Sequence, residues 1–218
     1  MSKHALVVWG GWDGHTPKQS VDRFIPFLEQ NGFTVTVSDD LASYADAALM
    51  AKQDLIVQCV TMSKISGDQF KGLNEAVKGG CGLAGWHGGL CDSFRENTEY
   101  QWMTGGQWVA HPGNCMAYDV HICNPFDAVT AGIADFRMPN TEQYYMHTDP
   151  GNVVLATTRF SGQHADETRD VIMPVVWKKK WGKGKVFYNS LGHTFADFDI
   201  PECRIITERG LLWAARSA

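Results

Sequence analysis

Long hydrophobic runs are missing from this sequence. No segment approaches the roughly 20 consecutive apolar residues that a helix needs to cross a bilayer. The first residues run directly into a strand-like stretch and show neither the apolar region nor the cleavage site of a signal peptide. We therefore expect a cytoplasmic protein with no membrane partner.

Paired cysteines and clustered basic residues are missing too. The six cysteines form no C-x-x-C pair, so buried free thiols are favoured over disulfides or a cysteine-based zinc site. The formal net charge is −5 at pH 7, which disfavours nucleic acid as a partner because phosphate binding needs clustered Lys and Arg. The one basic run, Lys178-Lys179-Lys180, stands next to Trp181-Gly182 and is predicted to form the solvated tip of a hairpin.

The composition is that of an ordinary globular protein. The 218 residues are 44% hydrophobic and 20% charged, which excludes a disordered chain and allows a sizeable core. No repeat, low-complexity tract or linker divides the sequence. We predict one domain over residues 1–218.

Strand-like and helix-like segments alternate in the first half of the chain. A Val-rich run over residues 4–9 predicts a buried parallel strand, and a helix is expected from Pro17, with Thr16 as its cap and Gln19 as the partner in a capping box. The pattern repeats, with further strands expected over 34–37, 54–60 and 81–86 and a second helix begun by Ser66. Such alternation predicts an α/β fold with a mainly parallel central sheet between two layers of helices.

The second half of the chain is less regular. A hairpin is expected to turn at residues 181–184, and an amphipathic helix over 201–216 closes the sequence. Strands are expected over residues 118–123, 143–147, 153–158, 171–177 and 186–191.

Three histidines follow predicted core strands. His15, His87 and His193 stand in the loops after the strands at 4–9, 81–86 and 186–191. Because ligands gather beyond the carboxyl ends of parallel strands, these side chains are candidate ligands for a divalent metal, zinc or a similar ion. Glu142 and His147 bracket another predicted strand, although no local spacing such as H-E-x-x-H supports a metal site.

The segment Gly85-Trp86-His87-Gly88-Gly89 has the pattern of a nucleophile elbow, a tight turn from strand to helix. The residue at the centre of such a turn is normally Ser or Cys, whereas His87 has no hydroxyl or thiol to be acylated. Cys91, four residues further on, is a poor substitute. An exposed His87 would serve as a general base or as a metal ligand.

Each candidate residue also has a purely structural interpretation. A single loop histidine is more often a hydrogen-bonded structural residue, and His4 and His164 receive that interpretation. His111, before Pro112, is a ligand, a supporting group or a loop anchor. Trp12 and Trp108 are expected to lie near the proposed site, where such rings would make good platforms for sugars. Most tryptophans, however, belong to cores or interfaces.

The chain contains, in this order, the blocks Gly85-Trp86-His87-Gly88-Gly89, Asp92-Ser93-Phe94, Glu99-Tyr100, Gly105-Gly106-Gln107-Trp108, His111-Pro112, Thr141-Glu142-Gln143-Tyr144-Tyr145 and Ser190-Leu191-Gly192-His193. Together these blocks resemble the ThuA-like (trehalose-utilisation) family. The resemblance implies the flavodoxin-like fold of class I glutamine amidotransferases and an association with the use of trehalose and related disaccharides. His87 at the elbow argues against glutaminase activity.

Three functions compete on this basis. The first is a hydrolase or lyase acting on 3-keto-glycosides, with His87, Glu142 and Asp92 as catalytic candidates. The second is a carbohydrate-binding or regulatory module without activity, and the third is an amidotransferase or a peptidase-like hydrolase that uses Cys91 or Cys115. The residues expected to bind a sugar substrate are Trp12, Trp108, His111 and Tyr144. The surplus of tryptophan and the apolar last helix favour a homo-oligomer.

Overall fold

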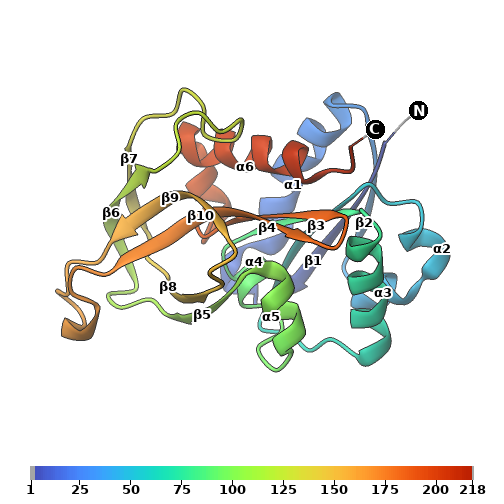
Figure 1. The fold of residues 1–218 in the computed structure, drawn as a ribbon, viewed down its shortest axis with the longest axis horizontal. Helices are drawn as coiled ribbons and strands as arrows, with labels where there is room; N and C mark the ends of the chain where they lie inside the picture. Colours follow the sequence, from blue (N-terminus) through green and yellow to red (C-terminus); the bar gives the residue numbers. More distant parts are fainter. Residues whose placement is uncertain (1–2, 218) are drawn as a thin grey trace.

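A mixed sheet runs through the middle of the molecule, and helices cover both of its faces (Figure 1). The structure is a computed structural model that describes residues 3–217. The strands are β1 (Lys3–Gly11), β2 (Phe33–Ser38), β3 (Leu55–Thr61), β4 (Gly82–Trp86), β5 (Gly106–Ala110), β6 (Cys115–Ile122), β7 (Phe136–Glu142), β8 (Tyr145–Thr148), β9 (Val153–Arg159), β10 (Ile172–Trp181) and β11 (Gly184–Asn189). The helices are α1 (Pro17–Gln30), α2 (Ala47–Met50), α3 (Gly67–Lys78), α4 (Gly88–Cys91), α5 (Thr98–Thr104) and α6 (Pro201–Ala214).

One half of the sheet is parallel and has the flavodoxin strand order. Within residues 3–217 the sheet has nine strands, in the order β2-β1-β3-β4-β11-β10-β9-β6-β7, and every pairing from β2 to β11 is parallel. With β11 as the fifth strand, this half follows the order 2-1-3-4-5 of flavodoxin-like folds. The predicted α/β class, a flavodoxin-like sandwich with a largely parallel sheet, is therefore confirmed.

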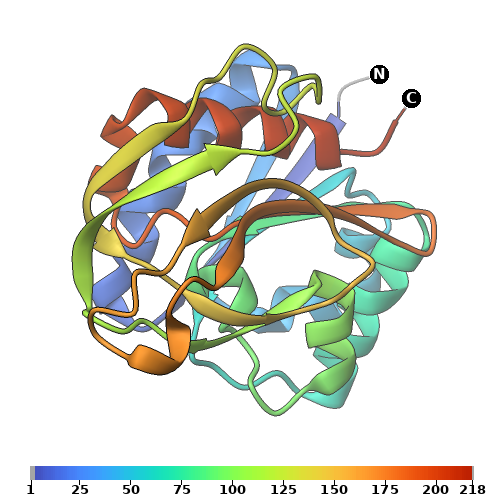
Figure 2. The ribbon, with the colours of Figure 1, turned by 60° about the vertical axis from the view of Figure 1, so that its left-hand side comes forward.

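The other half of the sheet is antiparallel. β10 pairs antiparallel with β11, and β9, β6 and β7 continue the sheet in the same way. Figure 2 shows these strands curving, so that the segment between β6 and β7 lies beside α6. Arg209 of α6 holds that segment by donating a hydrogen bond to the carbonyl oxygen of Ala131 at 2.7 Å.

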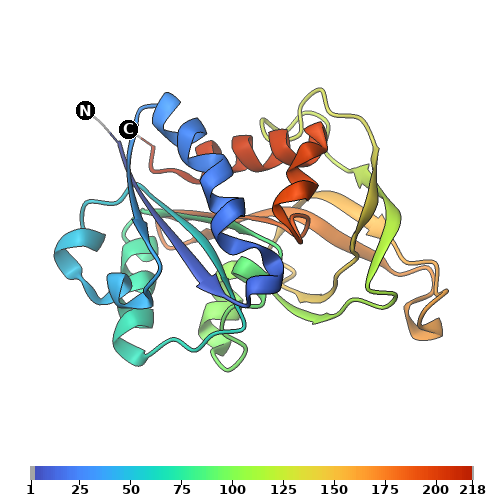
Figure 3. The same ribbon diagram turned by 180° about the vertical axis from the view of Figure 1, so that it is seen from behind.

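Two hydrophobic clusters separate the sheet from its helices. Figure 3 shows α1 and α6 together on one face and α3 on the other. Phe24 of α1 and Ile206 of α6 belong to the first cluster, and Leu73 of α3 and Met103 of α5 belong to the second. The central strands β3 and β4 are thus buried on both faces, which explains their nearly continuous apolar runs.

The two helix starts expected from the sequence differ in the structure. Ser66 and Gln69 form the reciprocal hydrogen bonds of a capping box at the start of α3. The capping box predicted for Thr16 and Gln19 is wrong, because Thr16 has a left-handed backbone (φ 46°, ψ 50°) and its side chain caps nothing in α1. Its hydroxyl instead accepts a hydrogen bond from the backbone N–H of Phe195 at 2.9 Å.

The basic run is not the tip of a hairpin, so that prediction is wrong. Lys178, Lys179 and Lys180 all lie within β10, and the turn follows Trp181. Side chains alternate between the two faces of a strand, so Lys179 is carried into the interior. There its ammonium lies 2.8 Å from a carboxylate oxygen of Asp149, and Lys178 pairs with Asp127.

Two smaller differences concern the strand ends and the membrane. The strand expected over 143–147 begins only at Tyr145 and continues to Thr148, so His147 lies inside it and does not end it. Over residues 3–217, none of the helices has both the length and the apolar character needed to span a bilayer.

Candidate functional site

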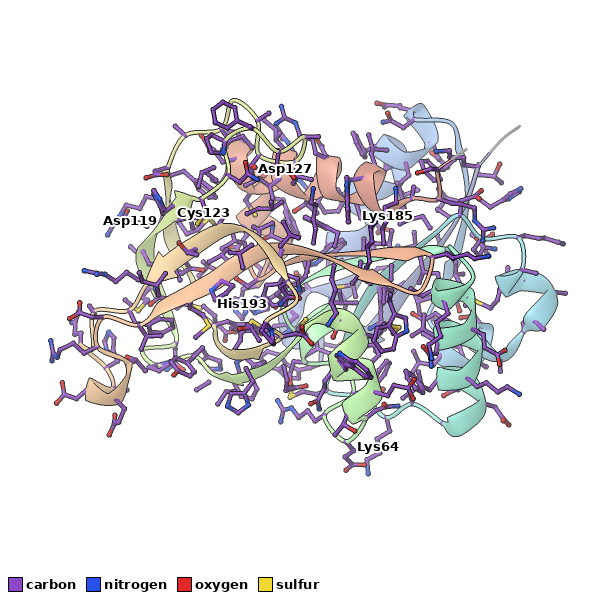
Figure 4. The ribbon with its side chains drawn as sticks, viewed as in Figure 1. Lys64, Asp119, Cys123, Asp127, Lys185 and His193 are labelled. Atoms are coloured by element: carbon purple, nitrogen blue, oxygen red, sulfur yellow. The ribbon has the colours of Figure 1, made fainter. Side chains whose placement is uncertain are left out.

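The three histidines at the strand ends meet in the structure. His15 follows β1, His87 follows β4 and His193 follows β11, and these parallel strands all end at the same edge of the sheet. Glu142, the last residue of β7, reaches the same point from the antiparallel half. One ligand atom from each of the four side chains lies within 4.8 Å of all the others. Figure 4 labels His193, which lies toward the middle of the molecule, whereas Lys64 and Asp119 lie at its periphery.

The carboxylate of Glu142 is the centre of this group. Its Oε2 atom lies 3.0 Å from Nε2 of His87, 3.3 Å from Nδ1 of His193 and 3.9 Å from Nε2 of His15. Its other oxygen, Oε1, lies 3.6 Å from Nε2 of His111. Four imidazole rings therefore surround one buried carboxylate.

The hydrogen bonds of the rings determine which nitrogens remain for a ligand. Nδ1 of His87 lies 2.7 Å from the carbonyl oxygen of Ser190, which only accepts, so this nitrogen carries a proton. In neutral His87 the lone pair on Nε2 then faces the carboxylate of Glu142. Two acceptors at 3.0 Å need a proton or a cation between them. Nδ1 of His193 is also buried and has no aligned hydrogen-bond partner among residues 3–217.

Burial sets the charges of the cluster. Burial, with smaller contributions from the neighbouring rings of His87 and His193, lowers the pKa of His15 from 6.5 to about 2. Burial also lowers the pKa of His87, although Glu142 partly opposes this. For Glu142, burial raises the pKa, but the imidazoles of His193 and His87 outweigh it and hold the pKa well below its ordinary value.

Neutral imidazoles around an ionised carboxylate are the ligand set of zinc and related divalent ions. The orphaned nitrogen of His193 and the facing acceptors of His87 and Glu142 both fit such an ion. The ring of His15 is oriented through the nitrogen that does not face Glu142: its Nδ1 lies at hydrogen-bonding distance, 2.9 Å, from the hydroxyl of Thr61. Metal-binding histidines in proteins are commonly oriented in this way by their second nitrogen.

The elbow around His87 is present, but its side chain is not displayed. His87 has a positive φ (φ 49°, ψ −143°), and a Cβ on Gly88 would lie only 2.7 Å from Cε1 of His15. The expectation of an exposed His87 is wrong, because only 1% of the residue is accessible to solvent. The ring of Tyr144 stacks on it, with centroids 3.9 Å apart, and separates it from solvent.

Backbone strain is concentrated around this group. Among residues 3–217, five residues other than glycine have positive φ angles, and four of them are His87, Thr16 directly after His15, and the cleft residues Met62 and Asn114. Such conformations cost of order 1–3 kcal/mol each and are frequent at functional sites. The strain is an indication of function that is independent of the cluster itself.

A cleft of about 360 Å³ opens onto the cluster. Its walls include the four side chains that the sequence predicts for sugar binding, Trp12, Trp108, His111 and Tyr144. Trp12 is 47% exposed and packs edge-on against His15, with ring centroids 4.8 Å apart. The cleft therefore combines flat apolar surfaces with the polar cluster at its floor.

Asp92 lies on the wall of this cleft and outside the cluster. Its carboxylate accepts hydrogen bonds from Nε and Nη2 of Arg95, at 2.6 and 2.8 Å, and one from Gln107 at 3.0 Å. The guanidinium of Arg95 in turn lies 4.7 Å from the ring centroid of Trp108. Asp92 thus holds a polar rim beside the aromatic wall, while its catalytic role remains a prediction.

The remaining candidates lie away from the floor of the cleft. His147 is exposed in β8. Cys91 is buried, and burial raises the pKa of its thiol well above the ordinary value, so it is a poor nucleophile. The supporting roles of Thr61, the Ser190 carbonyl and Arg95 were not predicted from the sequence, where only the i, i+3 spacing of Arg95 from Asp92 indicates a contact.

Comparison with known proteins shows one family and one fold. The model of the ThuA family, described as trehalose utilisation, matches residues 4–214. A ThuA-like protein from Bacteroides uniformis ATCC 8492 is 16% identical with a TM-score of 0.80, covering 97% of this chain and 91% of its own. A ThuA-like protein from Parabacteroides merdae ATCC 43184 is 18% identical with a TM-score of 0.78, covering 98% of this chain and 90% of its own.

A part of a much larger enzyme has a similar fold. The β-galactosidase from Bacillus circulans sp. alkalophilus is 14% identical, with a TM-score of 0.58 over 98% of this chain and 30% of the enzyme. At such identities, the structural likenesses establish the fold alone. No curated protein is significantly similar in sequence.

Proposed function

Because the chain belongs to the ThuA trehalose-utilisation family, we propose that it is a metal-dependent enzyme that acts on sugars. Its reaction is hydrolysis or elimination, and its substrate is a 3-keto-disaccharide or a related 3-keto-glycoside. The observation that carries this proposal is the convergence of three imidazoles and one carboxylate at the floor of an aromatic cleft.

His15, His87, Glu142 and His193 would hold the metal. A divalent ion bound there would supply Lewis acidity, which polarises a ketone or a water molecule. The chain itself contributes fixed ligands, since Thr61 and the carbonyl of Ser190 orient two of the rings. Burial keeps the rings of His15 and His87 neutral at pH 7, as metal ligation requires.

The other walls of the cleft suit the substrate. The rings of Trp12 and Trp108 offer flat faces for a sugar, and the ion pair of Arg95 and Asp92 offers hydrogen bonds to hydroxyl groups. Arg95 and Asp92 neutralise one another, which favours an uncharged sugar over a phosphorylated one.

A proton must also be moved in this reaction. A 3-keto group acidifies the neighbouring C–H bond, so that loss of its proton is followed by departure of the glycosidic oxygen. Addition of water then completes a net hydrolysis. His111 is the imidazole best placed to exchange a proton with a bound substrate, because its side chain is 29% exposed in the cleft and its Nε2 lies 3.6 Å from Glu142.

The test uses 3-keto-trehalose and the purified full chain, first treated with chelator and then supplied again with Zn²⁺. We expect turnover that chelation abolishes and zinc restores. His193→Ala should remove it, whereas His147→Ala, which deletes an exposed imidazole outside the cluster, should retain it. Absence of turnover in the zinc-supplied wild type would contradict the proposed reaction.

A carbohydrate-binding module without activity is the second candidate. It is favoured by the elbow, where His87 replaces a nucleophile, and by cleft walls that need no metal to hold a sugar. Calorimetry with trehalose and its 3-keto form distinguishes the two. A binding module would bind both sugars equally, and His87→Ala would leave the affinity unchanged.

A further inference from the structure

We infer that Asp197 is a positioning residue of this site, because its carboxylate ties the loop that carries His193 to the strand end that carries Glu142. Asp197 lies in the turn of 3-10 helix Phe195–Asp199, before α6, and is only 7% exposed. The inference rests on the proposed function, in which His193 and Glu142 hold one metal ion together.

One oxygen of Asp197 receives all three hydrogen bonds. Its Oδ2 accepts from the backbone N–H of Gly192 at 3.2 Å and from that of His193 at 2.9 Å. The same atom accepts from the hydroxyl of Thr141, the residue directly before Glu142, at 2.5 Å. Thr141 is fully buried. A single acceptor therefore connects two segments that come from opposite halves of the sheet.

The turn that carries Asp197 rests on a rigid support. The next residue, Phe198, is fully buried and packs edge-on against Phe24 and Trp86, with centroids 4.8 and 5.5 Å apart. Arg23 of α1 donates a hydrogen bond to the carbonyl oxygen of Phe198 at 3.1 Å. Asp197 thus acts as a fixed point against which the two ligand-bearing segments are placed.

The loop fits this support closely. Gly192 has a left-handed backbone with φ of 93°, and a Cβ there would lie 2.6 Å from the ring of Phe198. Glycine lets the chain come near enough for both N–H groups to reach Asp197. A site that binds metal needs its ligands held to within about 0.5 Å, which a surface loop does not provide by itself.

The test compares four variants of the full chain. Asp197→Asn keeps the shape and removes the charge, and Thr141→Val removes one donor while Thr141→Ser keeps it. Asp199→Asn is the matched control, since Asp199 lies in the same turn and binds Arg23 without touching either ligand-bearing segment. Zinc affinity is measured by competition with a chromophoric chelator, and ligand geometry by the absorption spectrum of bound Co²⁺.

We expect Asp197→Asn and Thr141→Val to bind zinc about tenfold or more weakly and to alter the Co²⁺ spectrum. Asp199→Asn and Thr141→Ser should resemble the wild type. Wild-type zinc affinity and an unchanged spectrum in both Asp197→Asn and Thr141→Val would overturn the inference. If Asp197→Asn does not fold, the comparison of Thr141→Val with Thr141→Ser decides.

A measurement without metal separates this inference from the proposed function. In ¹⁵N-histidine spectra of the metal-free chain, Asp197→Asn should shift the ring signals of His193, and Asp199→Asn should not. If the wild type binds neither Zn²⁺ nor Co²⁺, the proposed function fails, and these spectra still decide on Asp197. Unshifted His193 signals in Asp197→Asn would then overturn the positioning role.

Discussion

The buried histidines predict how folding stability depends on pH. Replacing His15 with Gln removes one imidazole whose pKa burial lowers from 6.5 to about 2. Between these two values the unfolded chain binds a proton at this position and the folded chain does not. Protonation therefore favours unfolding, and the contribution of His15 to stability falls as the pH drops below 6.5.

The magnitude follows from the same two pKa values. Between pH 7 and pH 5, the linkage relation gives a loss of about 2 kcal/mol from His15 alone. Any folded-state pKa well below 5 gives nearly the same result. His87 changes stability in the same direction, because burial lowers its pKa too. The lowered pKa of Glu142 acts only below its ordinary value of 4.5, outside this window.

Urea unfolding of the chelator-treated protein at pH 7, 6 and 5 measures the effect through tryptophan fluorescence. We expect the wild type to lose about 2 kcal/mol more than His15→Gln between pH 7 and pH 5. His147→Gln, which removes an exposed imidazole, controls for the loss of a histidine. Equal pH slopes in the wild type and His15→Gln would refute the claim that burial keeps His15 neutral.

Three further outcomes can be checked directly. Gly192→Ala should destabilise the fold by about 2–5 kcal/mol in urea unfolding, because Gly192 has a left-handed backbone and a Cβ there would clash with the ring of Phe198. Gly32 is the control: its backbone is also left-handed but no atom of residues 3–217 lies near its Cβ position, so Gly32→Ala should cost only about 1–2 kcal/mol. Iodoacetamide should label the exposed Cys115 and Cys123 in the folded chain and reach the buried Cys91 only on unfolding, as mapped by mass spectrometry. His87→Ala should weaken zinc binding by more than tenfold in competition titrations, because it deletes a ligand and leaves Glu142 without its nearest imidazole.

The parallel half of the fold was predictable because its signals are local. Short apolar runs indicate the buried strands, and Ser66 as a capping residue indicates the start of the helix that follows it. The three histidines were predictable for a related reason. In a parallel sheet, strand direction alone decides that the loops after β1, β4 and β11 meet at one edge.

The rest of the site depends on contacts that no local pattern encodes. Glu142 reaches the cluster only because the antiparallel strands curve back over the sheet, and its partner Tyr118 donates to its backbone carbonyl at 3.0 Å. Lys179 can be buried because its ammonium pairs with the carboxylate of Asp149. Asp197 meets Thr141 across 56 positions of the chain. Each of these pairings is a property of the tertiary packing.

The environment of His87 bears on which role an imidazole at an elbow can have. A general base must exchange its proton with a substrate, so one of its nitrogens has to face the cleft. In His87 one nitrogen is held by the carbonyl of Ser190 and the other faces Glu142 at 3.0 Å, while Tyr144 covers the ring. The tight turn therefore fixes this ring instead of presenting it. A fixed, neutral and buried imidazole suits a metal ligand. In the proposed reaction, the proton transfer would then fall to a side chain that lines the cleft, such as His111.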